Sequence, residues 1–281
     1  MLTVLSIKDY SDKRNRFRLL KRDKTNLEVV EYNGIQLVHI IYYKFNKKIN
    51  WNIISRLAGN EKTNILCNAN INIPPDCGIK RYTTNALKER IAENTAIEVI
   101  KRASEDFRSL NIGLYDPQGK KTELVNTLVK YSDNITVVTN AQNDYYNIYK
   151  QVIANTGAVL MLKTDLSALK SCNIVIATEK IKTQLPLDDN TILFTATKPA
   201  VCQGGRVFYN YVVALNESYK DIKPYSLSDE YFVQALYDKG RQHRLGTLLP
   251  ILCISDGANS TIDELGKFVK QHINYNKCNI T

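Results

Sequence analysis

Residues 119–122, Gly-Lys-Lys-Thr, are of the types that hold a phosphate group at the start of a helix. Their backbone amides, ammonium groups and hydroxyl would meet phosphate oxygens at the positive end of the helix dipole. Asp116 and Pro117 come just before them; Asp116 adds a negative charge where a diphosphate would lie, and Pro117 removes an amide donor. The simpler interpretation is a β-turn over 116–119 whose aspartate caps the helix. The alternative phosphate site, for a mononucleotide or another phosphorylated ligand, would use Gly119, Lys120, Lys121 and Thr122.

The glycine fingerprint of a dinucleotide site is missing at this turn. Such a site has Gly-x-Gly-x-x-Gly between the first strand and its helix. Here only Gly119 lies in the turn, because Gly113 falls inside the expected strand. A P-loop is missed too, since five residues separate these glycines and two lysines precede the threonine. The second strand ends near Asn140, where an NAD site would have an acidic residue for the ribose.

Other ligand-contacting candidates follow from the rule that open α/β sheets bind ligands at the carboxyl ends of their strands. Asn140, Thr178 and Lys198 each come at or just after such an end. No catalytic triad, general acid–base pair or metal-ligand cluster is recognisable, so catalytic residues stay unknown and no metal is expected. The candidate cofactor-binding residues are therefore Asp116, Gly119, Lys120, Thr122, Asn140, Thr178 and Lys198.

The histidines and cysteines give weaker signals. His39 lies in the strand expected over 35–45, and we expect it to be a hydrogen-bonded core or face residue. His243, between Arg241 and Arg244, could help to hold a carboxylate or phosphate, or could belong to an exposed basic connector. The six cysteines are scattered without a Cys-x-x-Cys pair, which gives no sign of a disulfide framework.

The net charge of +10 is concentrated at the start of the chain. Residues 1–108 carry 20 basic and 12 acidic side chains, and many of the bases lie within 13–24. This cluster is either a solvated face of an amphipathic segment or a surface for a polyanion such as nucleic acid. The second interpretation would use Arg14, Arg16, Arg18 and Arg22.

Short apolar runs that alternate with helical patterns predict a parallel sheet with helices on both faces. The repeat of about 22–25 residues is that of a Rossmann-type half. We expect strands over 111–115, 134–139, 158–162, 173–177, 191–195 and 207–215, with helices over 120–131 and 143–155. Before them, Asn33-Gly34 predicts a hairpin between 27–32 and 35–45, and a helix is expected over 84–107.

The predicted class is thus α/β. An N-terminal α/β domain over 1–108 precedes a three-layer Rossmann-like domain over 109–225. The C-terminal helices of 226–281 would pack back, with a return to the first domain as one option. This layout resembles the two-domain Rossmann dehydrogenases of the shikimate-dehydrogenase-like type. The resemblance implies the architecture only, because the glycine fingerprint and a Lys–Asp catalytic pair are not found.

Composition leaves three hypotheses of function. With 44% apolar and 23% charged residues, the chain is an ordinary globular protein, and disorder, collagen-like structure and a disulfide mini-protein are excluded. The first hypothesis is a non-catalytic, small-ligand or nucleotide-binding protein with a degenerate Rossmann-like domain. The second is an NAD(P)-dependent oxidoreductase with an atypical phosphate loop, and the third is a polyanion-binding module. The cofactor is none or NAD(P), and the oligomeric state is open. A cytoplasmic, membrane-free location is the default, since no signal peptide or membrane span is visible.

Overall fold

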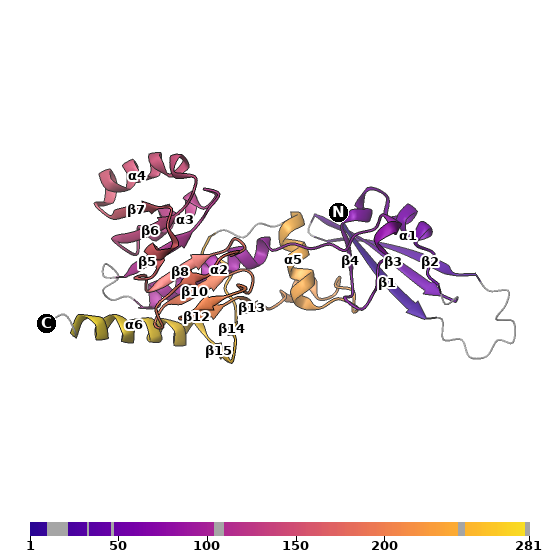
Figure 1. The fold of residues 1–281 in the computed structure, drawn as a ribbon. Coiled ribbons are helices and arrows are strands. Elements are labelled where there is room, and N and C mark those ends of the chain that lie inside the picture. Colours follow the sequence, from indigo (N-terminus) through magenta and orange to yellow (C-terminus); the bar gives the residue numbers. More distant parts are fainter. Residues whose placement is uncertain (10–21, 33, 46–47, 104–109, 241–244, 279–281) are drawn as a thin grey trace. The chain divides into compact units, whose positions relative to one another are not determined.

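The computed structural model describes residues 1–9, 22–32, 34–45, 48–103, 110–240 and 245–278 (Figure 1). Contacts within the chain divide it into two compact units. Unit 1 consists of Met1–Thr84 and Ala214–Gln242, and unit 2 of Asn85–Val213 and His243–Thr281.

Unit 1 contains a four-stranded sheet in the order β2-β3-β1-β4. Its strands are β1 (Leu2–Asp9), β2 (Lys24–Tyr32), β3 (Ile35–Lys44) and β4 (Ile65–Cys67). The predicted hairpin is confirmed: β2 and β3 are antiparallel, and Gly34 has a φ of 75° in the turn, which glycine adopts without strain. β1 runs parallel to β3 and β4, so their carboxyl ends share one edge of the sheet.

The described part of unit 1 also contains two α-helices, besides short 3-10 helices. Helix α1 (Trp51–Ala58) begins at Asn50, whose side chain accepts a hydrogen bond from the Ile53 amide, and its Ile54 is fully buried in the core beside Leu5 and Ile40. Helix α5 (Asp229–Gly240) begins after Ser228, whose Oγ accepts the Tyr231 amide at 3.3 Å.

Unit 2 is built on a six-stranded, wholly parallel sheet in the order β12-β10-β8-β5-β6-β7 (Figure 1). When these six strands are numbered 1 to 6 in chain order and the sheet is read from β7 to β12, the strand order is 3-2-1-4-5-6, which is that of the Rossmann fold. Its strands are β5 (Asn111–Tyr115), β6 (Asn134–Val138), β7 (Val159–Lys163), β8 (Ile174–Ala177), β10 (Ile192–Thr195) and β12 (Arg206–Phe208). The order reverses between β5 and β8, where such folds place their ligand. The fold class predicted from the sequence is confirmed.

The helices that connect these strands differ in length. Helices α3 (Thr122–Leu128) and α4 (Gln142–Thr156) follow β5 and β6, and the 3-10 helix η5 (Leu166–Leu169) follows β7. Strands β9 (Leu185–Pro186) and β11 (Cys202–Gln203) form a separate parallel pair. The connection after β7 therefore contains only a single helical turn, whereas the connection after β6 contains the 15-residue helix α4.

The run over 207–215, expected to be one strand, is two strands in different sheets. β12 ends at Phe208, and β13 (Asn210–Val212) pairs instead with β14 (Leu252–Ser255), which pairs with β15 (Ala258–Ser260). The hydrophobic pattern hides the division at Tyr209, because apolar residues lie on both sides of it: Val207 and Phe208 in β12, and Tyr211 and Val212 in β13.

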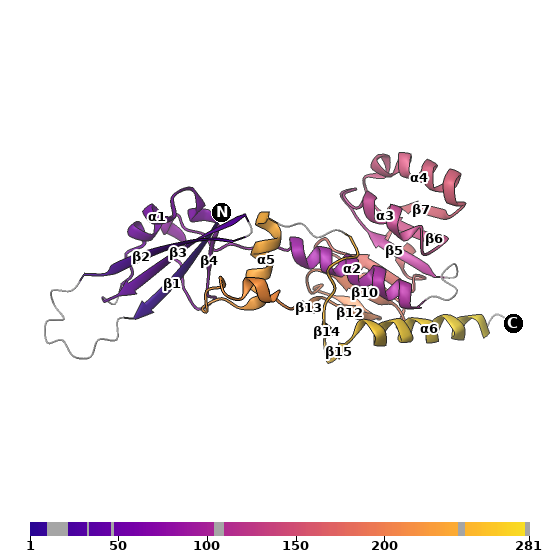
Figure 2. The same cartoon turned by 180° about the vertical axis from the view of Figure 1, so that it is seen from behind.

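The long helix expected over 84–107 is α2 (Ala86–Ala103), and it belongs to unit 2. It packs on β8, β10 and β13 and lies beside α6 (Ile262–Cys278) in both views (Figures 1 and 2). Gly266 permits this approach, because a Cβ atom there would lie 2.8 Å from the Cβ of Arg102. The border between the compact units therefore falls at Thr84/Asn85, whereas the sequence suggested 108/109. None of the described helices is both long and apolar enough to cross a membrane.

Candidate functional site

The carboxylate of Asp116 lies directly after β5, at the point where the Rossmann sheet reverses its order. Asp116 is fully buried. Its Oδ1 accepts the amide of Lys120 at 3.1 Å, and its Oδ2 accepts the amide of Lys121 at 2.8 Å. The hydroxyl of Tyr145, on α4, donates to the same Oδ2 at 2.5 Å. These amides lead into α3, so an internal anion occupies the place where a diphosphate would meet the chain.

The turn before α3 is packed against the start of α4. The Gly119 amide donates to the Asp116 carbonyl at 3.3 Å, which confirms the β-turn predicted over 116–119. Gly119 has a φ of 73°, and a Cβ atom there would lie 2.6 Å from Asp144 Oδ2 and 2.8 Å from Ala141 Cβ. The glycine therefore serves close packing between two segments of the chain, and little room remains above it for a phosphate group.

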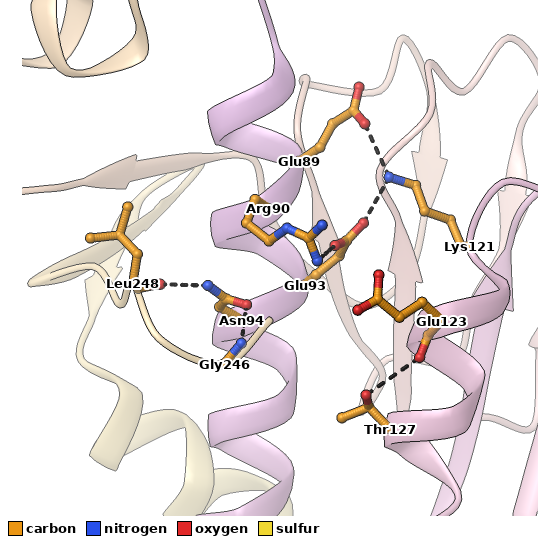
Figure 3. A network of polar contacts seen from close by, with 9 residues as sticks. All are labelled: Glu89, Arg90, Glu93, Asn94, Lys121, Glu123, Thr127, Gly246 and Leu248. Atoms are coloured by element: carbon orange, nitrogen blue, oxygen red, sulfur yellow. Dashed lines mark hydrogen bonds and ion pairs between the residues drawn. The ribbon is translucent and has the colours of Figure 1, made fainter. Parts of the chain in front are cut away.

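Lys121, the second lysine of the turn, is held by helix α2 (Figure 3). Its ammonium lies 2.7 Å from Glu93 Oε1 and 3.1 Å from Glu89 Oε2, while Arg90 pairs with the other oxygen of Glu93 at 3.1 Å. Burial alone would lower the pKa of the Lys121 ammonium, but Glu93 and Glu89 outweigh it and raise this pKa. Lys121 thus neutralises Glu93, whose side chain is only 3% exposed, and is not free to hold a ligand.

Glu179 brings a second carboxylate to the same edge of the sheet. It follows β8 by two residues, next to Thr178, which is buried. Burial and the negative charge of Asp116 raise the pKa of the Glu179 carboxyl, with Lys120 and Lys121 acting in the opposite direction. The edge between β5 and β8 therefore carries negative charge, which disfavours a diphosphate.

The remaining candidates divide into two groups. Lys120 and Asn140 are exposed at this edge, and the Asn140 amide donates to the Pro117 carbonyl at 3.4 Å. Thr122 is half-buried at the start of α3. Lys198 does not join them in any described contact; it lines a separate cavity of unit 2. Glu93 and Tyr145 were missed from the sequence, because nothing local links either residue to the turn.

The cavity at Lys198 has a volume of about 640 Å³. The Lys198 ammonium lies 2.5 Å from Asp256 Oδ2, and the Tyr209 hydroxyl donates to Asp256 Oδ1 at 2.7 Å. Lys198 and then Tyr209 lower the pKa of the Asp256 carboxyl. The Arg206 guanidinium lies 3.7 Å above the ring of Phe268. The cavity is lined by Lys198, Pro199, Ala200, Gly204–Tyr209, Ser255–Ala258 and Ser260.

Gly204 and Gly205 shape the wall of this Lys198 cavity. Both have positive φ, and a Cβ atom on Gly204 would lie 2.3 Å from the Leu187 carbonyl oxygen. The segment that leads into β12 is therefore fixed against the loop before β10. Among the described residues, Arg206 has no carboxylate partner, so one cation of the cavity is not neutralised.

Comparison with known proteins identifies no family. No protein-family model matches the chain, and no curated protein matches it. An L-tryptophan dehydrogenase from Nostoc punctiforme is 14% identical over 60% of this chain and 52% of its own, with a TM-score of 0.31. A lysine cyclodeaminase, in a structure concerned with recognition of L-lysine, L-ornithine and L-2,4-diamino butyric acid, is 12% identical over 71% and 62%, with a TM-score of 0.30.

A third solved structure is similar to the same degree. It is the Delta(1)-pyrroline-2-carboxylate reductase of Thermococcus litoralis with NADH and L-proline, 8% identical over 73% of this chain and 71% of its own, at a TM-score of 0.30. The chain spans about half of the first protein and less than two thirds of the second. The Rossmann-like layout expected from the sequence rests on the strand order of unit 2 itself. At these scores the likeness to the three structures gives no support for a shared substrate, cofactor or activity.

Proposed function

We propose that this chain is a small-ligand-binding protein built on a Rossmann-like domain, and that it does not hold a dinucleotide at the β5–α3 turn. The observation that carries this proposal is the buried carboxylate of Asp116, which already accepts the Lys120 and Lys121 amides. A bound diphosphate would have to displace this carboxylate. It would then leave Asp116 without its donors and put further negative charge beside Glu179.

The ligand-binding place in this proposal is the Lys198 cavity. Its volume of about 640 Å³ lies within the roughly 300–1,000 Å³ usual for small-molecule sites. Lys198 is already paired with Asp256, whereas Arg206 is stacked on Phe268 and keeps its donors for a ligand. A planar guanidinium in a cavity favours a carboxylate or a phosphate group. The proposed ligand is therefore a small acid.

The test compares two classes of ligand by thermal shift and calorimetry. NAD(H), NADP(H), ATP and S-adenosylmethionine are expected to leave the melting temperature unchanged. Small carboxylic acids and phosphate esters are screened in parallel, and a true ligand at 100 times its Kd should stabilise the protein by about 2.7 kcal/mol. Arg206→Gln should abolish that shift. Lys182→Gln removes one exposed cation of unit 2 that does not line the cavity, and it should have no effect.

Two results would contradict the proposal. Saturable binding of NAD(P)H that survives Arg206→Gln would favour the oxidoreductase hypothesis. If a ligand raises the melting temperature of Arg206→Gln and Lys182→Gln equally, it binds outside the Lys198 cavity. The polyanion hypothesis stays open, because Arg14, Arg16 and Arg18 lie outside the described residues and only Arg22 lies within them.

A further inference from the structure

A row of polar side chains crosses the four-stranded sheet of unit 1. Glu28 on β2 and His39 on β3 are directly paired in the antiparallel register, and Glu28 Oε2 lies 3.7 Å from His39 Nδ1. Val4 on β1 pairs with His39, so Ser6 lies two residues further along, on the same face. Ser6 Oγ is 2.8 Å from His39 Nε2. A carboxylate, an imidazole and a hydroxyl thus follow one another across three adjacent strands.

The row continues to a fourth group outside the sheet. Ser226 Oγ lies 2.9 Å from Ser6 Oγ. Ser226 is half-buried in the turn closed by the Leu227 amide and the Pro224 carbonyl, directly before α5. Its carbonyl accepts the side-chain amide of Asn68 at 2.9 Å, which ties this turn to the end of β4.

Ser226 also lines a cavity of about 240 Å³ at the carboxyl end of β4. Ser6 is 3% exposed and does not line it, so Ser226 is the hydroxyl through which the row reaches this space. The cavity is lined by Cys67, Asn68, Ala69, Arg81, Ser226, Leu227, Ser228 and Tyr231. The cavity at Ser226 thus holds one relay-linked hydroxyl and one guanidinium.

The protonation state of His39 suits a base. Burial is the largest influence and lowers the pKa of its imidazole; Glu28 opposes this and Lys8 adds to it. These two charged groups, one from β2 and one from β1, face the ring. A neutral imidazole can accept the Ser6 proton, and the cation that forms would be stabilised by Glu28.

Positive charge at the cavity comes from Arg81. Its Nη2 donates to the carbonyls of Asn68, Ala69 and Ile71, which fixes the guanidinium in place. Ser228, the residue before α5, lies at the positive end of a 12-residue helix and also lines the cavity. A fixed guanidinium and a helix terminus would both favour the negative charge that develops on a carbonyl oxygen under attack.

We propose that Ser226 is a nucleophile for acyl transfer, activated through Ser6 and His39. Ser226 Oγ forms a bond to the carbonyl carbon of a small ester or thioester, its proton passes to Ser6, and the Ser6 proton passes to His39 Nε2. Collapse of the tetrahedral intermediate breaks the bond to the leaving alkoxide or thiolate, which takes a proton back from His39 through Ser6. Water then releases the acid by the same steps, with His39 as base. The cavity volume limits the acyl group to a few carbon atoms.

The test uses a fluorophosphonate probe on the full-length protein, with intact mass and peptide mapping as the readout. The wild type should gain one adduct, at Ser226, and should gain none when it is denatured before the probe is added. Ser226→Ala should abolish labelling. His39→Gln should slow labelling by about 100-fold, the usual contribution of a general base. Ser218→Ala, which removes an exposed hydroxyl of unit 1, should label like the wild type.

A second measurement separates loss of chemistry from loss of fold. Each variant is checked by thermal unfolding, and hydrolysis of p-nitrophenyl acetate is followed for a burst of one equivalent. Ser226→Ala removes a half-buried hydroxyl that is hydrogen-bonded to Ser6, so it should stay folded with a slightly lower melting temperature and show no burst. An unlabelled but folded wild type, an adduct at another residue, or an unchanged rate in folded His39→Gln would each overturn the proposal. None of these outcomes bears on the Lys198 cavity.

Discussion

Two aspartates of unit 2 show how the same side chain closes one place and leaves another open. Asp116 is buried after β5, and its three donors all come from the chain itself. Asp256 lies at the Lys198 cavity, which has a volume of about 640 Å³. Its partners Lys198 and Tyr209 line this cavity together with Arg206. At the β5–α3 turn, residue types that suggest phosphate binding therefore stabilise the fold. At the Lys198 cavity, charged groups border a space that a ligand can enter.

The comparison predicts its largest effect for Asp116→Ala. The variant leaves two backbone amides and the Tyr145 hydroxyl buried without their acceptor, at about 1–3 kcal/mol each, so we expect a loss of about 4 kcal/mol in the free energy of unfolding. Urea denaturation measures it. Tyr145→Phe removes one donor and should cost only about 1 kcal/mol. A loss under about 1 kcal/mol for Asp116→Ala would mean that this carboxylate is not what closes the turn.

The next effect concerns Lys121, which neutralises Glu93. Lys121→Met keeps the length of the side chain but leaves a 3% exposed carboxylate with Arg90 alone, and breaking such a buried pair costs about 3 kcal/mol. The double variant Lys121→Met with Glu93→Gln should recover most of this loss, since the uncompensated charge is then gone. Chemical denaturation of the two variants decides the point, and equal losses would contradict the assigned ion pair.

The sequence predicts the strands of unit 2 well, because each is a short apolar run with a turn signal on both sides. The capping box of α6, where Glu264 and Thr261 exchange hydrogen bonds between side chain and backbone, is equally local. The β-turn at Gly119 follows from its Asp-Pro-Gln-Gly residues. These features depend on residues at most a few positions apart.

Long-range features could not be predicted in this way. Tyr145 lies 29 residues from Asp116, and Lys121 lies 32 residues from Glu89. Asn94, a polar residue in the middle of α2, is buried: its side chain donates to the Leu248 carbonyl at 3.0 Å and accepts the Gly246 amide (Figure 3). A polar residue in a helix looks the same in sequence whether it meets water or a distant loop.

A smaller effect is expected from Gly119→Ala, which tests how tightly the turn is covered. The positive φ and the contact with α4 together should cost about 2 kcal/mol. Gly157→Ala is the matched control: Gly157 has a φ of 68°, but a Cβ atom there would meet nothing within 4 Å, so only the conformational cost of about 1 kcal/mol remains. Equal losses in thermal or urea unfolding would show that the turn has room above it for a ligand.

The smallest effect is expected at Asp256, which is exposed. Lys198 and Tyr209 lower the pKa of this carboxyl in the folded protein, so the stability it contributes is present above the unfolded value of about 3.9 and is lost as the pH falls through the lower, folded value. Lys198→Met should return the pKa toward its usual value, as followed by NMR titration of the side-chain carbon, with little change in stability near neutral pH. Lys182→Gln should leave the titration unchanged, and added salt should weaken the shift in the wild type. A titration that is the same in Lys198→Met and the wild type would mean that Lys198 does not pair with Asp256 in solution, so that both cations of the cavity are open to a ligand.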